Sequence, residues 1–130
     1  MKILNNQEPC SVFSSNAISS SYALSRWNLL AKERADITKL RDRSSGHEQA
    51  AYRKILESCT NEMEQLIPLL VSIFKHIKKH HIMKAIIAIY FANISCEDWA
   101  DTCGKSADEL YHEINETLEE IDREILKEAS

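Results

Sequence analysis

Three histidines and four lysines gather between residues 75 and 84, and they raise the first question about chemistry. His76 and His80 are four residues apart, a spacing that puts two imidazoles on one face of a helix and suits zinc. No thiol or carboxylate nearby completes a ligand set, so we expect no metal and no cofactor. The lysines are better suited to neutralising phosphate, with a solvated helix end as the alternative. They are Lys75, Lys78, Lys79 and Lys84.

Four cysteines are spread along the chain without a Cys-x-x-Cys pair. Cys96 and Cys103 are about two helical turns apart, so a redox pair on one helical face is one interpretation. The other interpretation is that each cysteine is simply a small buried hydrophobic residue. This second interpretation is favoured because no cationic neighbour activates either thiol. No local motif places a thiol beside a histidine base, which predicts a protein that is not an enzyme. Free cysteines without an export signal favour a cytoplasmic location.

Charge is distributed unevenly over the 130 residues, although the formal net charge is only −4. Residues 1–60 carry nine Lys/Arg and six Asp/Glu, and residues 61–91 carry four and two. Residues 92–130 carry three Lys/Arg against twelve Asp/Glu. Residues 1–91 are therefore mildly basic and residues 92–130 strongly acidic. This distribution favours a basic partner for the C-terminal part.

Helical periodicity without strand patterns predicts an all-α fold. We expect a flexible leader over 1–20 and one helical domain over 21–130, divided into an antiparallel helical hairpin (21–67) and a helix-turn-helix-like unit (68–130). The hairpin helices should flank a break at 44–46, with a break or kink between 59 and 68 ahead of Pro68. Continuity through that proline is left open. Apolar runs at 66–74 and 82–92 are too short to span a bilayer, so no membrane contact is expected.

One apolar stripe of the first helix is expected to exceed what a single partner helix covers. A homodimer through the hairpin is therefore predicted. The stripe consists of Leu24, Trp27, Leu30, Ala31, Ile37 and Leu40.

Two serine caps and one glycine delimit the C-terminal helices. Ser95 and Ser106 are each followed three residues later by an acid, as in a capping box. Gly104 suits the left-handed residue that ends a helix. The pattern predicts a short helix over 96–103, a tight turn and a long acidic helix over 107–128. Its predicted core is Tyr90, Ile94, Trp99, Leu110, Ile114 and Leu118, with Trp99 mostly buried.

The residues YFANISCEDWA (90–100), GKS (104–106) and LY (110–111) resemble the helix-turn-helix of sigma-factor region 4. Within this group the segment most resembles that of small phage late-transcription regulators of the ArpU and RinA type, which also have a helical hairpin before the motif. The resemblance implies DNA reading by the first turns of the last helix, where basic or amide side chains are expected. In this chain that segment carries one lysine and two acids. The corresponding positions are Lys105, Ser106, Ala107, Asp108, Glu109, Tyr111 and His112.

Two classes of function remain. The first is a transcription-associated regulator, phage or bacterial, acting by DNA binding or by contacts with the transcription machinery. In it Lys105, Ser106 and His112 lie near the groove and the four lysines bind phosphate. The second is a non-enzymatic interaction module, an inhibitor, adaptor or DNA mimic, whose acidic last helix binds a basic protein surface. Its candidate contacts are Glu109, Tyr111, His112, Glu113 and Glu116.

Overall fold

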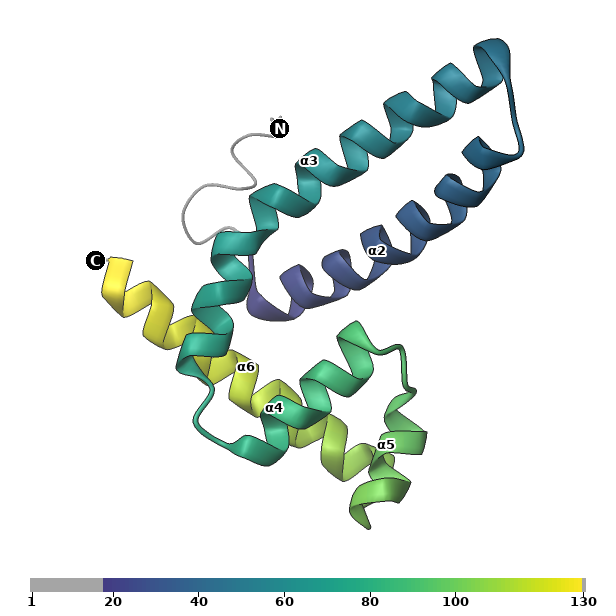
Figure 1. Ribbon diagram of the computed structural model, residues 1–130. Coiled ribbons are helices and arrows are strands. Elements are labelled where there is room, and N and C mark those ends of the chain that lie inside the picture. The colour runs from purple at the N-terminus through teal and green to yellow at the C-terminus, as the bar shows by residue number, and fades with distance from the viewer. Residues whose placement is uncertain (1–17, 130) are drawn as a thin grey trace, which may run out of the picture.

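The computed structural model describes residues 18–129, and all the regular secondary structure in this part of the chain is helical, without a strand (Figure 1). The all-α prediction is therefore confirmed. The elements are α2 (Ser20–Asp42), α3 (Gly46–His76), α4 (His80–Ile86), the π-helix η2 (Ile87–Phe91), α5 (Cys96–Cys103) and α6 (Ala107–Ala129). Most of the expected leader, residues 1–17, lies outside the described residues. Helix α2 begins at Ser20, one residue before the expected start of the helical domain, and Ser20 is buried.

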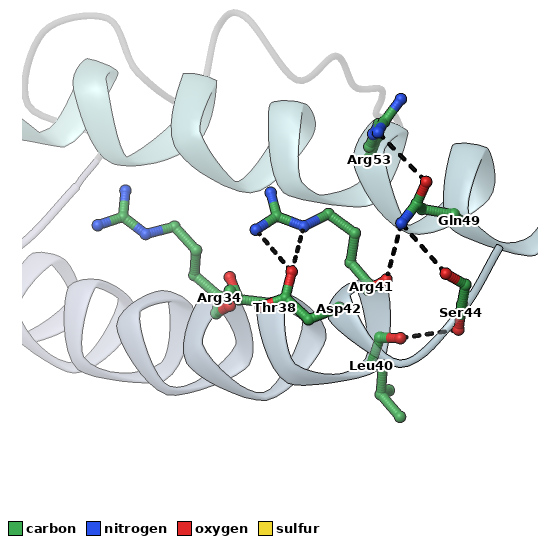
Figure 2. Close-up of polar contacts among 8 residues, drawn as sticks. All are labelled: Arg34, Thr38, Leu40, Arg41, Asp42, Ser44, Gln49 and Arg53. Atoms are coloured by element: carbon green, nitrogen blue, oxygen red, sulfur yellow. Dashed lines mark hydrogen bonds and ion pairs between the residues drawn. The ribbon is translucent and has the colours of Figure 1, made fainter.

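Helices α2 and α3 lie side by side in antiparallel directions, joined by residues 43–45 (Figure 1). Gly46 opens α3 with a φ of +62°, a left-handed conformation that glycine adopts without a Cβ penalty. The Gln49 side-chain amide donates to the carbonyl oxygens of Arg41 and Ser44 at 3.2 and 3.1 Å, which closes the turn (Figure 2). Further along, Arg26 pairs with Glu62 through two hydrogen bonds of 2.5 and 2.8 Å.

Helix α3 continues without interruption through Pro68 over its 31 residues, so of the break or kink expected between 59 and 68 the break is wrong. The expected boundary between residues 67 and 68 likewise falls inside α3. Proline removes one backbone donor and crowds the preceding turn, which bends a helix when neighbours hold it together. Figure 1 shows α3 changing direction along its second half. Buried side chains before and after the proline, including Leu66 and Leu70, keep both parts of α3 in the core.

Helix α5 begins and ends, and α6 begins, where the predicted caps place them. The Ser95 hydroxyl accepts a hydrogen bond from the Asp98 amide at 3.1 Å, and Gly104 ends α5 with a φ of 71°. At the next helix, Ser106 and Glu109 exchange backbone-to-side-chain hydrogen bonds of 3.1 Å, as the capping box requires. Sequence-local chemistry was sufficient here because each cap involves residues three positions apart.

The core lies where the six elements meet, away from the 43–45 turn. Leu110, Ile114 and Leu118 of α6 are each 1% exposed, as predicted. Trp99 is partly buried and packs against this core, and its indole N–H is buried without a hydrogen-bond partner among the described residues. Among residues 18–129, no helix has the length and apolar content needed to cross a lipid bilayer.

Helix α6 also caps the start of α2. The Asp122 carboxylate accepts hydrogen bonds from the Ser20 amide at 2.9 Å and from the Ser20 hydroxyl at 2.6 Å. Because Ser20 is fully buried, water cannot replace this partner. The hydrogen bonds join segments 102 residues apart and anchor the pair of long helices to the C-terminal part.

Candidate functional site

The two histidines proposed to share one helical face lie on different elements. Helix α3 ends at His76 and α4 begins at His80, with an extended backbone between them. His76 is instead held inside the fold, with Nδ1 2.7 Å from the Ser72 carbonyl and Nε2 2.9 Å from a Glu128 carboxylate oxygen. Nowhere in the described part of the chain do three or more His, Cys, Asp or Glu side chains gather as a metal site would require.

Lys105 and Glu113, both predicted to contact a partner, contact each other. The Lys105 ammonium donates to one carboxylate oxygen of Glu113, while His81 lies 2.8 Å from the other. These contacts, with Lys105 as the main cause, lower the pKa of Glu113 to about 2, and they raise the pKa of Lys105. The single lysine of the proposed DNA-reading segment is therefore neutralised within the chain.

Ser106 and Glu109 are also committed to the fold. The Ser106 hydroxyl and the Glu109 carboxylate both satisfy orphan amides at the start of α6. The hydrogen bonds with Ser106 lower the pKa of the Glu109 carboxyl. Neither side chain is left to read a base edge from this position. Tyr111, which is 57% exposed, and His112 are also exposed and take no part in this capping box.

Acidic side chains cover the exposed surface around the α5–α6 turn. His112 lies 3.5 Å from Glu116, and both are open to solvent, so this pair neutralises little. Beyond it the exposed residues include acids on both helices, with one arginine further along α6. The exposed acids are Glu97, Asp98, Asp101, Asp108, Glu116, Glu119 and Glu120. The surface beside the turn is therefore negative.

The four candidate lysines are exposed but come from three places. Lys75 lies in the last turn of α3, Lys78 and Lys79 follow it, and Lys84 lies in α4. None of the four forms an ion pair with another residue of the described range 18–129. They keep the capacity to bind an anion that the α5–α6 turn lacks.

The cysteines do not form an activated pair. Cys96 and Cys103 are the first and last residues of α5, about 10 Å apart along its axis, which is too far for a disulfide. The Cys96 thiol donates to the Ala107 carbonyl at 3.6 Å, and burial raises its pKa, which disfavours the reactive thiolate. Burial likewise raises the pKa of Cys59, which donates to the Leu30 carbonyl. Cys10 lies outside the described residues.

A polar hollow between α2 and the 89–95 segment was missed by the sequence reasoning. The Asn28 side-chain amide donates to the Tyr90 carbonyl and to the Asn93 side-chain oxygen, both at 2.7 Å. Asn93 has a φ of 61°, and the hollow of about 390 Å³ is also lined by Lys32 and Ser95. The only signal in the sequence was that asparagine tolerates a left-handed backbone. The hydrogen bonds themselves could not be predicted, because Asn28 lies more than 60 residues from Tyr90 and Asn93.

His76 gives a prediction about pH. Hydrogen bonds to the Ser72 carbonyl and the Glu128 carboxylate raise its pKa in the folded state. The stability it contributes is therefore complete below the pKa of the unfolded chain and is lost as the pH rises through the folded pKa. We expect His76→Gln to lower the free energy of unfolding by about 1 kcal/mol at pH 5.5 and by less at pH 8.5.

Urea denaturation of both proteins at the two pH values measures this difference. His47→Gln is the matched control, because His47 is exposed at the start of α3 and forms no ion pair with another described residue. An equal effect at both pH values would contradict the role of the charged imidazole.

No protein-family model, no curated protein and no solved structure matches the chain.

Proposed function

We propose that this chain is a non-enzymatic interaction module whose acidic α5–α6 surface binds a basic surface on a protein partner. The observation that carries the proposal is the negative surface around the turn, where the one lysine is paired with Glu113. A phosphate backbone would be repelled there, whereas a basic protein would be attracted. Glu113 and Glu109 serve the fold, so the partner contacts pass to Glu116, Glu119 and Glu120, with Tyr111 as an exposed aromatic beside them.

The setting we propose is transcription. Helix α5, the turn at Gly104 and α6 follow one another in the order of a helix-turn-helix unit, with the α2–α3 pair before them. This order agrees with the resemblance of residues 90–111 to sigma-factor region 4. Contacts with the transcription machinery then take the place that DNA contacts have in that family.

DNA binding by a regulator is the second candidate. It is favoured by one observation, the exposed lysines at 75, 78, 79 and 84 that have no ionic partner among the described residues. In this case the lysines contact phosphate and the affinity depends steeply on salt. The α5–α6 surface then faces away from the duplex.

Matched charge variants separate the two candidates. In NMR titrations with an arginine-rich helical peptide, we expect shifts of the α5 and α6 amides, because opposite charges attract across the acidic surface. Glu116→Gln, Glu119→Gln and Glu120→Gln combined should weaken peptide binding by roughly tenfold or more. Glu48→Gln, Glu57→Gln and Glu64→Gln on α3 are the control, since they change the net charge equally at three other exposed acids.

A random-sequence DNA duplex provides the opposing measurement. The proposal expects no binding at physiological salt. Binding that is abolished by exchanging the four lysines for glutamine, and that is insensitive to the α6 variants, would reject the acidic surface and establish the second candidate.

A further inference from the structure

The far end of the α2–α3 pair projects from the rest of the molecule with only two helices (Figure 1). Between Leu30 and Cys59, whose thiol-to-carbonyl hydrogen bond marks the last buried layer, no residue is buried. We call this segment, residues 31–58, the arm. Two helices alone cannot enclose a core. Apolar side chains on both arm helices therefore remain in contact with water.

Both helices of the arm carry an exposed apolar residue. Leu40 is 40% exposed and Ile55 is 49% exposed. Leu40 follows Ile37 by three residues on α2, and Ile37 and Ile55 together line a hollow of about 270 Å³ between the helices. In Figure 2 the Leu40 side chain points away from α3. The hollow lies between the two helices and Leu40 projects from α2, so the arm offers both to a partner.

The face of α2 that carries Leu40 has two more exposed apolar residues nearer the core. Leu29 and Tyr22, each 46% exposed, precede Leu40 by 11 and 18 residues, close to three and five whole helical turns. Glu33 and Asp36 lie on the same face between Leu29 and Leu40, so Tyr22 and Leu29 are isolated exposed apolar residues that need no explanation. The apolar residues that concern the arm are therefore Ile37, Leu40 and Ile55.

Charge along the arm changes sign between its tip and its base. Residues 38–56, the tip, carry five Lys/Arg and two Asp/Glu. Residues 31–37 and 57–58, the base, carry two Lys/Arg and three Asp/Glu, and two further acids follow directly outside the arm, of which Glu62 is neutralised by Arg26. A basic tip and an acidic base make the arm complementary to itself when two arms lie antiparallel.

We propose that the arm pairs with the arm of a second copy of this chain, in an antiparallel two-fold arrangement. Each tip then lies on the partner's base, and the apolar residues of both copies meet near the two-fold axis. Four helices enclose the core that two cannot, in the manner of a four-helix bundle. The proposal is independent of the partner of the α5–α6 surface, which lies at the other end of the molecule (Figure 1).

Sedimentation of the full chain tests the interface. We expect a species of twice 14.9 kDa at tens of micromolar. Leu40→Glu with Ile55→Glu should raise the dimer dissociation constant by roughly a hundredfold, about tenfold for each apolar side chain removed from the interface. Val71→Glu is the control, because Val71 is 60% exposed on α3 but outside the arm, and it should leave the dimer unchanged. A wild-type monomer, or a dimer that survives the double change, overturns the proposal.

Charge reversal tests the antiparallel direction without touching apolar side chains. Lys39→Glu with Arg43→Glu makes the tip acidic, so it repels the partner's acidic base and should raise the dissociation constant at low salt. Adding Glu33→Lys and Glu57→Lys to the same chain should restore the dimer. A parallel dimer would place tip on tip, and tip reversal would then tighten it. Tighter association of the Lys39→Glu, Arg43→Glu variant therefore overturns the arrangement.

Discussion

Replacing Trp99 by alanine is expected to lower the free energy of unfolding by about 3 kcal/mol, the usual cost of truncating a large aromatic in a core. The indole packs against the cluster that joins α5 to α6, and nothing else in the short α5 has comparable size. Chemical denaturation monitored by circular dichroism measures the change. An unchanged midpoint would show that the ring does not support the core.

Trp99→Phe is the informative control for that experiment. The Trp99 indole N–H is buried without a partner among the described residues, so phenylalanine sacrifices ring volume but no hydrogen bond. We expect Trp99→Phe to cost about half as much as Trp99→Ala or less. Equal damage from both changes would indicate that the N–H has a partner.

Replacing Asp122 by alanine is expected to lower the free energy of unfolding by about 2 kcal/mol. Its carboxylate accepts from both the amide and the hydroxyl of Ser20, which is 0% exposed, so the change strands two buried donors. Urea denaturation measures the decrease.

Two controls bracket the Asp122 experiment. Glu119→Ala removes an exposed acid from the same helix and should change stability by no more than about 0.5 kcal/mol. Asp122→Asn keeps an acceptor oxygen and should recover part of the stability. Decreases of similar size for Asp122→Ala and Glu119→Ala would mean that Asp122 does not act as the cap of α2.

Local signals accounted for the features whose chemistry is contained within a few residues. The Ser95 and Ser106 caps, the left-handed Gly104 and the end of α2 near residue 42 all lie where their residue types predict. Continuity through Pro68 stayed open because propensity within one segment ignores burial on either side of it. Leu66 and Leu70 hold α3 together through the proline, and no single-segment pattern contains that information.

The candidate site was harder to predict because the roles of its charges depend on distant neighbours. Glu113 looked available for a partner, yet His81, 32 residues away in sequence, and Lys105 both bind it. His76 and His80 looked like one face of a helix, but α3 ends between them. A side chain's type sets what it can bind, while its neighbours decide whether it is already bound.

The sequence by itself determined the helical class, the positions of the short C-terminal helices and the acidic character of α6, because capping, periodicity and net charge are local or additive properties. Only the tertiary structure decided which charges remain free. It paired Lys105 with Glu113, brought Asp122 to Ser20 across 102 positions, and left the arm without a third helix from residues 18–129 to cover it. These outcomes depend on which distant surfaces are brought together, since a hydrogen bond or a buried apolar contact exists only when both partners are in place.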